Sequence, residues 1–300
     1  MYIHSRTRWG RGARGSVPVL PPSGFLTCGA FTAEYGAGVT KLQIIGGGKM
    51  AEALLGGLLA NSWAQADEVH VVEPVAERRD ELVAAYPGLS VGEAPVPSAD
   101  AVLAVKPNIV PLILEGLANA GVSRVLSIAA GVRTDAIEAG LTVGAAVIRA
   151  MPNTPALVGQ GAAGVAGGAA ADSADIEWAS GILSAVGHVE VVSEPDLDAV
   201  TGLSGSGPAY VFHLAEGLIA AGIAEGLDPA TADALARQTL LGAATLLSQS
   251  GEDPGTLREN VTSPNGTTAA GLAVFAEHDF VGLVGKVVHA AAERSRALGA

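Results

Sequence analysis

The sequence contains a single cysteine, Cys28, among its 300 residues. One cysteine cannot form an internal disulfide or supply a cysteine-rich metal site. Aromatic residues make up only 4% of the chain, and the formal net charge is −13. A negatively charged protein with few aromatic rings repels phosphate backbones and offers few surfaces on which bases can stack. These shortages argue against a disulfide scaffold, a cysteine-ligated metal protein and a nucleic-acid-binding protein.

Charged residues are also scarce, at 16%, whereas hydrophobic residues reach 49% and the chain holds 40 glycines. This composition is typical of a well-packed globular protein, and 300 residues are enough for two domains. No apolar run reaches the roughly 18–20 residues that cross a bilayer without interruption by glycine or charge. We therefore expect a soluble, cytoplasmic protein with neither a membrane nor a nucleic acid as partner.

The first 40 residues differ from the rest of the chain. They carry Arg6, Arg8, Arg11 and Arg14 but a single acid, Glu34. They lack the continuous apolar core of a secretory signal. We expect residues 1–40 to be a disordered extension without a role in the activity, and Cys28 within it receives no role.

Short apolar strands alternate with amphipathic helices from residue 41 onward. Strands are expected at residues 42–45, 69–72, 101–105, 124–128 and 145–149, with two more near 163–166 and 188–192. Alternation of this kind is typical of a parallel, doubly wound sheet. The sequence thus predicts an α/β, Rossmann-type domain over residues 41–193.

The strand pattern ends at about residue 193. Long helices rich in alanine, glycine and leucine are expected at residues 207–226, 229–250 and 280–298. The apolar surface of these helices is too large for one thin helical layer, so we expect it to pair with a second copy of the chain. Residues 194–300 are therefore predicted to form an all-α dimerisation domain.

A glycine-rich turn follows the first predicted strand and precedes the first predicted helix. Gly46 and Gly48 occupy the positions that make the tight turn and let the backbone approach a pyrophosphate, and Ala51 permits close packing of helix and strand. This context favours dinucleotide binding over a merely structural turn. The cofactor-binding residues predicted here are Ile45, Gly46, Gly47, Gly48, Lys49 and Met50.

The residues after the second predicted strand bear on which dinucleotide is bound. Glu73 ends that strand, where an acid would bind the ribose 2′-hydroxyl and favour NAD. Arg78 and Arg79 follow, and they either hold a 2′-phosphate or lie on a solvated helix face. These residues leave the choice between NAD and NADP open.

The stretch 254–275 reads as a short helix, a polar turn and the start of another helix. Residues 263–266, Ser-Pro-Asn-Gly, have the chemistry of a turn. Thr267 or Thr268 is then expected as the N-cap of the second helix. A helix N-terminus behind such a turn suits a small carboxylate, and a neighbouring hydroxyl can exchange a hydrogen bond with a nitrogen. An ordinary capped helix is the plainer interpretation of the same residues.

This stretch resembles the signature of pyrroline-5-carboxylate reductases, enzymes of proline biosynthesis. The matching positions are Pro254, Leu257, Val261, Thr262, Ser263, Asn265, Gly266, Thr268, Gly271, Leu272 and Phe275. Residues 201–210, TGLSGSGPAY, are a second match to that family. The loops at 104–107 and 149–155 also resemble loops of these reductases, and the likeness covers residues 41–298.

The resemblance implies hydride transfer from NADPH, with NADH possible, to the C=N carbon of 1-pyrroline-5-carboxylate, which gives L-proline. Thr268 matches the position proposed to assist the proton at the ring nitrogen. Backbone N–H groups of Ser263, Gly266, Thr267 and Thr268 are the candidates for binding the substrate carboxylate. No metal is needed for this chemistry, and active sites completed between subunits of a dimer, or of a larger ring of dimers, are expected.

The same resemblance places more residues at the cofactor. Ala104, Val105, Lys106 and Pro107 match the loop at the cofactor ribose, and Asn153 lies in the loop near the nicotinamide.

Three other functions fit parts of the sequence. A hydrolase would need Ser204 or Ser206 in a catalytic triad, and no recognisable triad order is present. A β-hydroxyacid dehydrogenase would need a lysine on a helix of the second domain, yet no lysine occurs between Ser193 and Phe280. A sensor that binds NADP without turnover is disfavoured by the two intact substrate loops.

Overall fold

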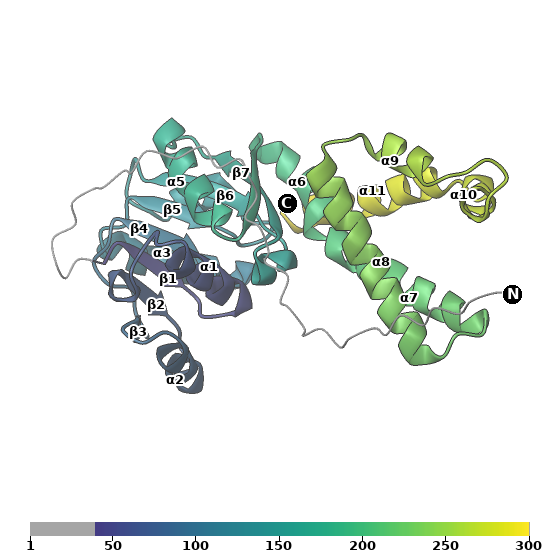
Figure 1. Cartoon of the computed structure of the whole chain (residues 1–300). Helices are drawn as coiled ribbons and strands as arrows, with labels where there is room; N and C mark the ends of the chain where they lie inside the picture. The colour runs from purple at the N-terminus through teal and green to yellow at the C-terminus, as the bar shows by residue number, and fades with distance from the viewer. Residues whose placement is uncertain (1–39, 300) are drawn as a thin grey trace, which may run out of the picture. The chain divides into compact units, whose positions relative to one another are not determined.

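The protein is described here by a computed structural model that covers residues 40–299. The predicted extension at residues 1–40, apart from Thr40, and Cys28 within it lie outside the described residues. The described chain begins with a sheet and its covering helices and continues as helices alone (Figure 1). We refer to these as the sheet half and the helical half.

In the described chain, the strands form one sheet in the order β3-β2-β1-β4-β5-β6-β7-β8. They are β1 (Leu42–Ile45), β2 (Val69–Val72), β3 (Ser90–Gly92), β4 (Asp100–Leu103), β5 (Arg124–Ser127), β6 (Ala146–Met151), β7 (Gly161–Gly167) and β8 (Gly187–Val191). The strand order reverses beside β1, because β2 and β3 lie on one side of it and β4 to β6 on the other. Such a reversal is where ligands bind in doubly wound sheets.

The seven strands expected from the sequence are present, and the Rossmann-type fold is confirmed. The short strand β3 was not predicted, because three residues that include a glycine carry no period-2 signal. The expectation of a wholly parallel sheet was wrong at one place, since β7 runs antiparallel to β6. Only residues 152–160 connect these two strands, and a parallel crossover needs about a dozen residues or more.

The helices of the sheet half cover both faces of the sheet. They are α1 (Lys49–Ala60), α2 (Ala76–Ala85), α3 (Val110–Asn119), α4 (Thr134–Glu138) and α5 (Ser173–Ser184), with 3₁₀ turns η1 (Ala66–Glu68), η2 (Pro107–Ile109) and η3 (Thr154–Val158). Neighbouring residues of β1 enter different cores: Ile44 belongs to the core that contains Leu54 of α1, and Ile45 belongs to the core that contains Leu114 of α3. Side chains alternate across a strand, so β1, β2, β4, β5 and β6 each contribute to both cores.

The helical half contains no strand within residues 194–299. Its elements are η4 (Glu194–Asp196), α6 (Leu197–Val200), the π turn η5 (Thr201–Gly205), α7 (Gly207–Ala224), α8 (Pro229–Ser250), α9 (Pro254–Asn260), α10 (Thr267–Glu277) and α11 (Phe280–Leu298). The three long helices expected from the sequence are therefore confirmed.

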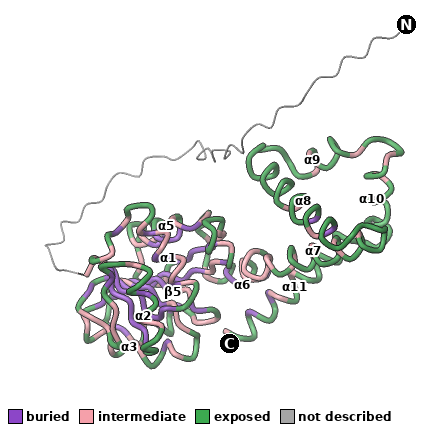
Figure 2. Tube along the Cα trace, turned by 60° about the horizontal axis from the view of Figure 1, so that its bottom comes forward, coloured by how far each residue is buried: buried purple, intermediate pink, exposed green. Residues whose placement is uncertain are grey.

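The two halves differ in how they bury apolar side chains. Buried residues gather in the sheet half, whereas the tube of α7, α8, α10 and α11 is mostly exposed (Figure 2). No residue of α7 or α10 is buried, and the side chains of Phe212 and Val281 are 63% and 82% exposed. The helical half of a single chain thus leaves a large apolar surface uncovered.

One helical stretch in the described chain, Glu194–Ala224, is long and apolar enough to cross a membrane by length and composition, with a mean hydropathy of 1.2. None of its most apolar window is buried. The stretch is not a continuous apolar run, because glycines and acids such as Asp198 and Glu216 interrupt it, in agreement with the sequence analysis. Its apolar side chains belong to the surface that the helical half leaves uncovered.

Candidate dinucleotide and substrate site

Gly46 forms the tight turn between β1 and α1. Its φ is +102°, and a Cβ at this position would lie 2.7 Å from the carbonyl oxygen of Ala104. Ala104 in turn donates a backbone hydrogen bond to Ile45 at 2.9 Å. Only glycine fits this conformation and this close approach. The turn after β1 and the loop after β4 are therefore in contact, as the cofactor prediction requires.

Gly48 faces open space at the N-terminus of α1. It is the N-cap residue, no side chain caps the helix, and a Cβ built on Gly48 would meet no atom within 4 Å. Lys49 and Met50 begin the helix, and Ala51 is buried against the sheet. Uncapped N–H groups at a helix N-terminus attract anions. The turn therefore fits the pyrophosphate of a dinucleotide.

Glu73, directly after β2, supports this turn. Its buried carboxylate accepts hydrogen bonds from the backbone N–H of Gly47 and from that of Val75, each at 2.9 Å. The sequence predicted a ribose contact for Glu73 and missed this bond to Gly47. The Glu73 carboxylate therefore connects the end of β2 to the glycine turn.

Arg78 holds the same glycine from α2. Its Nε donates to the carbonyl oxygen of Gly47 at 2.7 Å, and its two terminal nitrogens pair with Glu52 at 2.6 Å and Glu81 at 2.7 Å. The hydrogen bonds to Glu81 and Glu52 raise the pKa of the Arg78 guanidinium above its usual range. The alternative of a merely solvated helix face was therefore wrong for Arg78.

Arg79 is also held by protein groups. It donates to the carbonyl oxygens of Glu73 and Pro74, each at 2.9 Å, and pairs with Glu93 at 2.7 Å. The solvated alternative was therefore wrong for Arg79 as well, because backbone carbonyls at the β2 edge bind its guanidinium.

The loop after β4 reaches the same edge of the sheet. Lys106 is exposed and precedes η2, in which Pro107 is the first residue. Within residues 40–299 the ammonium group of Lys106 has no hydrogen-bond or ion-pair partner. A cation in this position can attract the phosphates of a ligand bound at the glycine turn.

Asn153, after β6, links the two halves of the chain. Its Nδ2 donates to the carbonyl oxygen of Ser204 in η5 at 3.0 Å, and its Oδ1 accepts from the N–H of Ala162 at 2.9 Å. The side chain is buried, at 8% exposure. The sequence placed Asn153 near the nicotinamide and missed its bond to the helical half.

Backbone bonds and close packing hold the segment around η5, which belongs to the second family match at residues 201–210. Ser206 is the N-cap of α7 but makes no side-chain cap, and the Ser204 hydroxyl donates to the Val200 carbonyl at 3.1 Å. A Cβ on Gly205 would lie 2.7 Å from Cε of Met151, and its φ is not positive. This glycine is therefore explained by close packing rather than by an unusual conformation.

A second link between the halves centres on Glu194, which sequence reasoning did not identify. Its carboxylate accepts from the N–H and the hydroxyl of Thr134, at 2.8 and 2.7 Å, and from Arg149 at 3.3 Å. These bonds tie α4 and β6 to the first residue of the helical half.

The predicted substrate loop lies between α9 and α10. Asn265 has a φ of +57°, as the turn prediction requires. The predicted N-cap was wrong: Gly266 is the N-cap, and α10 begins at Thr267. Gly266 has an extended backbone with φ −82° and ψ 174°, and glycine is an accepted N-cap residue that needs no side-chain bond.

The backbone N–H groups of this loop are not equivalent. The N–H of Gly266 donates to the carbonyl of Ser263 at 3.0 Å, so it already has an acceptor within the turn, and its role in binding a carboxylate stays a prediction. The N–H groups of Thr267 and Thr268 lie in the first turn of α10 and have no acceptor among the described residues. The side chains of Ser263 and Thr268 are exposed.

The structure brings together some predicted residues and not others. The glycine turn, Glu73 and the 104–107 loop meet at one edge of the sheet. Among the described residues, no hydrogen bond or ion pair joins residues 263–268 to the sheet half.

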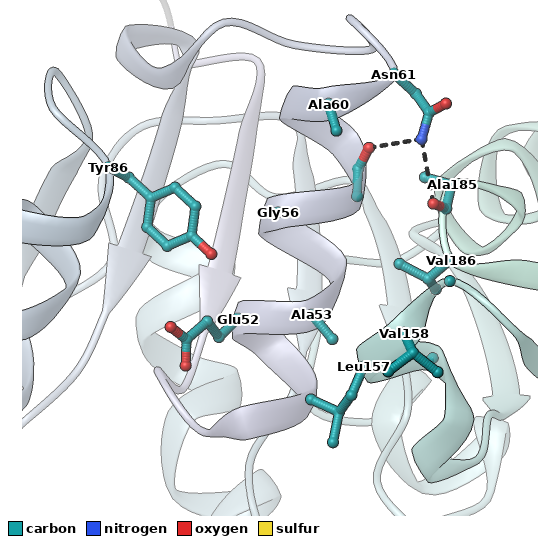
Figure 3. A pocket seen from close by; sticks show the side chains of 13 residues that line it. Glu52, Ala53, Gly56, Ala60, Asn61, Tyr86, Leu157, Val158, Ala185 and Val186 are labelled. Atoms are coloured by element: carbon teal, nitrogen blue, oxygen red, sulfur yellow. Dashed lines mark hydrogen bonds between the residues drawn. The ribbon is translucent and has the colours of Figure 1, made fainter. Parts of the chain in front are cut away.

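A surface groove of about 500 Å³ lies beside α1 (Figure 3). Tyr86, Leu157 and Val158 line it, and Asn61 donates hydrogen bonds to Gly57 and Ala185 at its rim. No predicted cofactor or substrate residue lines this groove. Across residues 40–299, no three His, Cys, Asp or Glu side chains gather as a metal site.

The strand order, the glycine turn and the open α1 N-terminus define a dinucleotide-binding protein of the Rossmann class. Residues 41–131 match the family model described as NADP oxidoreductase coenzyme F420-dependent, and residues 194–298 match the model described as pyrroline-5-carboxylate reductase dimerisation. The chain belongs to the pyrroline-5-carboxylate reductase family, as relatives at 44% and 33% identity over most of the chain show.

The pyrroline-5-carboxylate reductase of Synechocystis sp. is 44% identical over 264 residues, which are 86% of this chain and 98% of that protein. The structure of a pyrroline-5-carboxylate reductase from Coxiella burnetii has a TM-score of 0.82 and 33% identity, over 87% of this chain and 99% of that chain. The Plasmodium falciparum pyrroline carboxylate reductase with NADP bound has a TM-score of 0.74 and 28% identity, over 88% and 100%. The resemblance inferred from the sequence is confirmed.

Proposed function

We propose that this protein reduces 1-pyrroline-5-carboxylate to L-proline, the final step of proline biosynthesis. The observation that carries the proposal is the extent of the likeness, because 44% identity to a pyrroline-5-carboxylate reductase spans 86% of the chain and so includes both halves. The alternative of a sensor without turnover would need only the nucleotide-binding half to be kept. The alternative of a β-hydroxyacid dehydrogenase lacks a lysine between residues 193 and 280.

NADPH, or NADH, supplies the hydride in this reaction. The residues of this chain bind and orient that cofactor. The uncapped N–H groups at the start of α1 bind the diphosphate, while Gly46 and Gly48 leave room for it. Lys106, from the loop after β4, adds a positive charge at the same edge of the sheet. Asn153 positions the loop after β6, beside which the nicotinamide is expected.

The residues at the start of α10 receive the substrate. N–H groups of Thr267 and Thr268 have no acceptor in the described chain, and the positive end of the helix dipole favours the substrate carboxylate there. The Thr268 hydroxyl hydrogen-bonds to the ring nitrogen and assists the delivery of a proton from water to it; the hydride adds to the C=N carbon, the C=N π bond breaks, and the nitrogen becomes the secondary amine of proline. The exposed Ser263 side chain borders the same turn.

A second copy of the chain completes the assembly. The apolar side chains of α7, α8, α10 and α11 are largely exposed, and they lie within the segment that matches the dimerisation model. Pairing of two copies buries these side chains, so the exposed stretch Glu194–Ala224 faces a partner subunit rather than lipid. We propose at least a homodimer in the cytoplasm, with a cofactor domain over residues 41–193 and a dimerisation domain over residues 194–300.

The test is steady-state oxidation of NADPH, and in parallel of NADH, when 1-pyrroline-5-carboxylate is added to the purified protein. We expect rapid oxidation that depends on the imine, with proline as the product. Binding of NADP without turnover on either cofactor would overturn the reductase and support the sensor. Gel filtration or light scattering on the same sample measures the size of the assembly.

A further inference from the structure

Protein groups hold all three nitrogens of Arg78 beside the glycine turn, in the region after β2 where a 2′-phosphate is expected. Each of the three guanidinium nitrogens donates to one protein acceptor: Nε to the Gly47 carbonyl, Nη2 to Glu52 and Nη1 to Glu81. Arg78 is anchored beside the phosphate-binding turn because its Nε bonds to Gly47. Glu73, which marks the expected ribose position, bonds to the N–H of the same Gly47.

The two carboxylates that hold Arg78 come from different helices. Glu52 lies in the first turn of α1 and Glu81 lies one turn further along α2 than Arg78. Their side chains are 35% and 65% exposed, whereas that of Arg78 is 25% exposed. Removing either carboxylate therefore frees one guanidinium nitrogen without cutting into the core.

Arg79 is a weaker candidate for the same role. Two of its hydrogen bonds go to backbone carbonyls of Glu73 and Pro74, which no side-chain substitution removes. Its remaining partner, Glu93, is 71% exposed. Of the two arginines, Arg78 is therefore the one whose guanidinium can be released by substituting the side chains that bind it.

Resting on the proposed use of NAD(P)H, we propose that Glu52 and Glu81 set the preference between NADH and NADPH by holding Arg78 away from the 2′ position. A 2′-phosphate must compete with two carboxylates for this guanidinium, and the carboxylate of Glu73 adds further repulsion. A 2′-hydroxyl needs no cation and meets an acceptor in Glu73. The two glutamates therefore weaken NADPH binding and leave NADH binding nearly unchanged.

The experiment measures the dissociation constants of NADH and NADPH by fluorescence titration of the full chain without substrate. The variants are Glu52→Gln, Glu81→Gln and the double variant. Because a charge-assisted bond to phosphate is strong, we expect the double variant to bind NADPH about tenfold more tightly, with the NADH constant within about twofold. Adenosine 2′-phosphate and adenosine 5′-phosphate, used as competitors, should show the same contrast.

Glu77→Gln is the matched control. Glu77 is an exposed acid in the first turn of α2 with no ion pair in the described chain, so its loss changes the local charge without freeing Arg78. We expect Glu77→Gln to leave the ratio of the two constants within about twofold of the unmodified protein, since an exposed charge is screened. Adding Arg78→Ala to the double variant should abolish the gain in NADPH affinity.

Three results would overturn the proposal. They are an unchanged ratio in the double variant, an equal gain with Glu77→Gln, and a gain that persists after Arg78→Ala. If the double variant binds neither cofactor, the ratio of the two dissociation constants is measured in each single variant instead. If both single variants also lose affinity for NADH and for NADPH alike, the glutamates support the turn and do not select the cofactor. Cofactor binding is measured without 1-pyrroline-5-carboxylate. A lack of turnover would therefore overturn the proposed reductase activity without affecting the binding result.

Discussion

Asn153 donates a hydrogen bond from its Nδ2 to the carbonyl oxygen of Ser204 at 3.0 Å, and this bond connects the loop after β6 to the π turn of the helical half. The same side chain accepts from the N–H of Ala162. Both bonds are shielded from water because Asn153 is buried. One amide thus satisfies two backbone groups that belong to different parts of the chain.

Asn153→Asp should destabilise the protein more than Asn153→Ala. Aspartate keeps an acceptor for Ala162 but turns a carboxylate oxygen toward the Ser204 carbonyl, so a donor is replaced by a repulsive contact. We expect losses of about 3 kcal/mol for Asp and about 2 kcal/mol for Ala in the free energy of unfolding, since buried polar groups are left unpaired. Urea denaturation measures both, with the exposed Asn108→Ala as control, which should cost at most about 0.5 kcal/mol. Equal losses in the Asp and Ala variants would contradict the donor role of Asn153.

Gly46→Ala and Gly48→Ala should fail in different ways. An alanine at 46 would place its Cβ 2.7 Å from the Ala104 carbonyl and would need a φ of +102°, so we expect loss of stability by about 2 kcal/mol or more. An alanine at 48 meets no protein atom within 4 Å, so the fold should keep its melting temperature. Its methyl group instead occupies space proposed for the pyrophosphate, and NADPH binding should weaken.

Thermal unfolding and NADPH titration of the two glycine variants separate these effects. A Gly48→Ala protein with unchanged cofactor affinity would show that the open space beside this glycine is not the phosphate site. A Gly46→Ala protein as stable as the unmodified chain would contradict the close approach of β1 and β4 seen here.

Thr268→Ala should lower turnover by about 10–100-fold, because one acid–base group is worth about 10²–10⁴-fold and the cofactor carries out the main step. Thr267→Ala removes a neighbouring hydroxyl but keeps the backbone N–H, so it should change turnover much less. Thr268→Ser restores a hydroxyl and should recover most of the activity. Steady-state rates at saturating NADPH measure all three, and unchanged turnover in Thr268→Ala would remove the catalytic role.

His70 should make the stability depend on pH. It is 4% exposed in β2, its Nδ1 lies 2.8 Å from the Ser90 hydroxyl, and its Nε2 lies 3.3 Å from the Ala94 carbonyl. Burial lowers the pKa of His70 below its ordinary value of 6.5, and the bond to Ala94 opposes this shift in part. The unfolded chain therefore binds the proton more readily than the folded chain.

Because the pKa of His70 is lower in the folded chain, the free energy of unfolding contains the full contribution of neutral His70 above pH 6.5. The free energy of unfolding falls as the pH drops from 6.5 to the lower pKa of the folded chain. The slope from this one group is at most about 1.4 kcal/mol per pH unit. Urea denaturation between pH 7.5 and 5.5, compared with His70→Gln, measures it. An identical pH dependence in both proteins would show that His70 is not the source.

The order of elements and the position of the glycine turn were determined by the sequence itself. The strands Leu42–Ile45 and Val69–Val72 are buried on both faces. A strand of this kind is a short, mainly apolar run of consecutive residues, so it can be recognised in the sequence alone. The turn at Gly46 could likewise be predicted, because a left-handed conformation between a strand and a helix calls for glycine. The family signature around Thr268 was visible for the same reason, since its residues are close in sequence.

Only the tertiary structure decided which groups the site residues bind. The bonds from Gly47 to Glu73, from Arg78 to Gly47 and from Asn153 to Ser204 join residues 26, 31 and 51 positions apart. The antiparallel direction of β7 and the N-cap at Gly266 depend in the same way on packing and on competing backbone bonds. A side chain that bonds to a distant backbone group carries no periodic or compositional signal, so these contacts exist only once the sheet and helices have assembled.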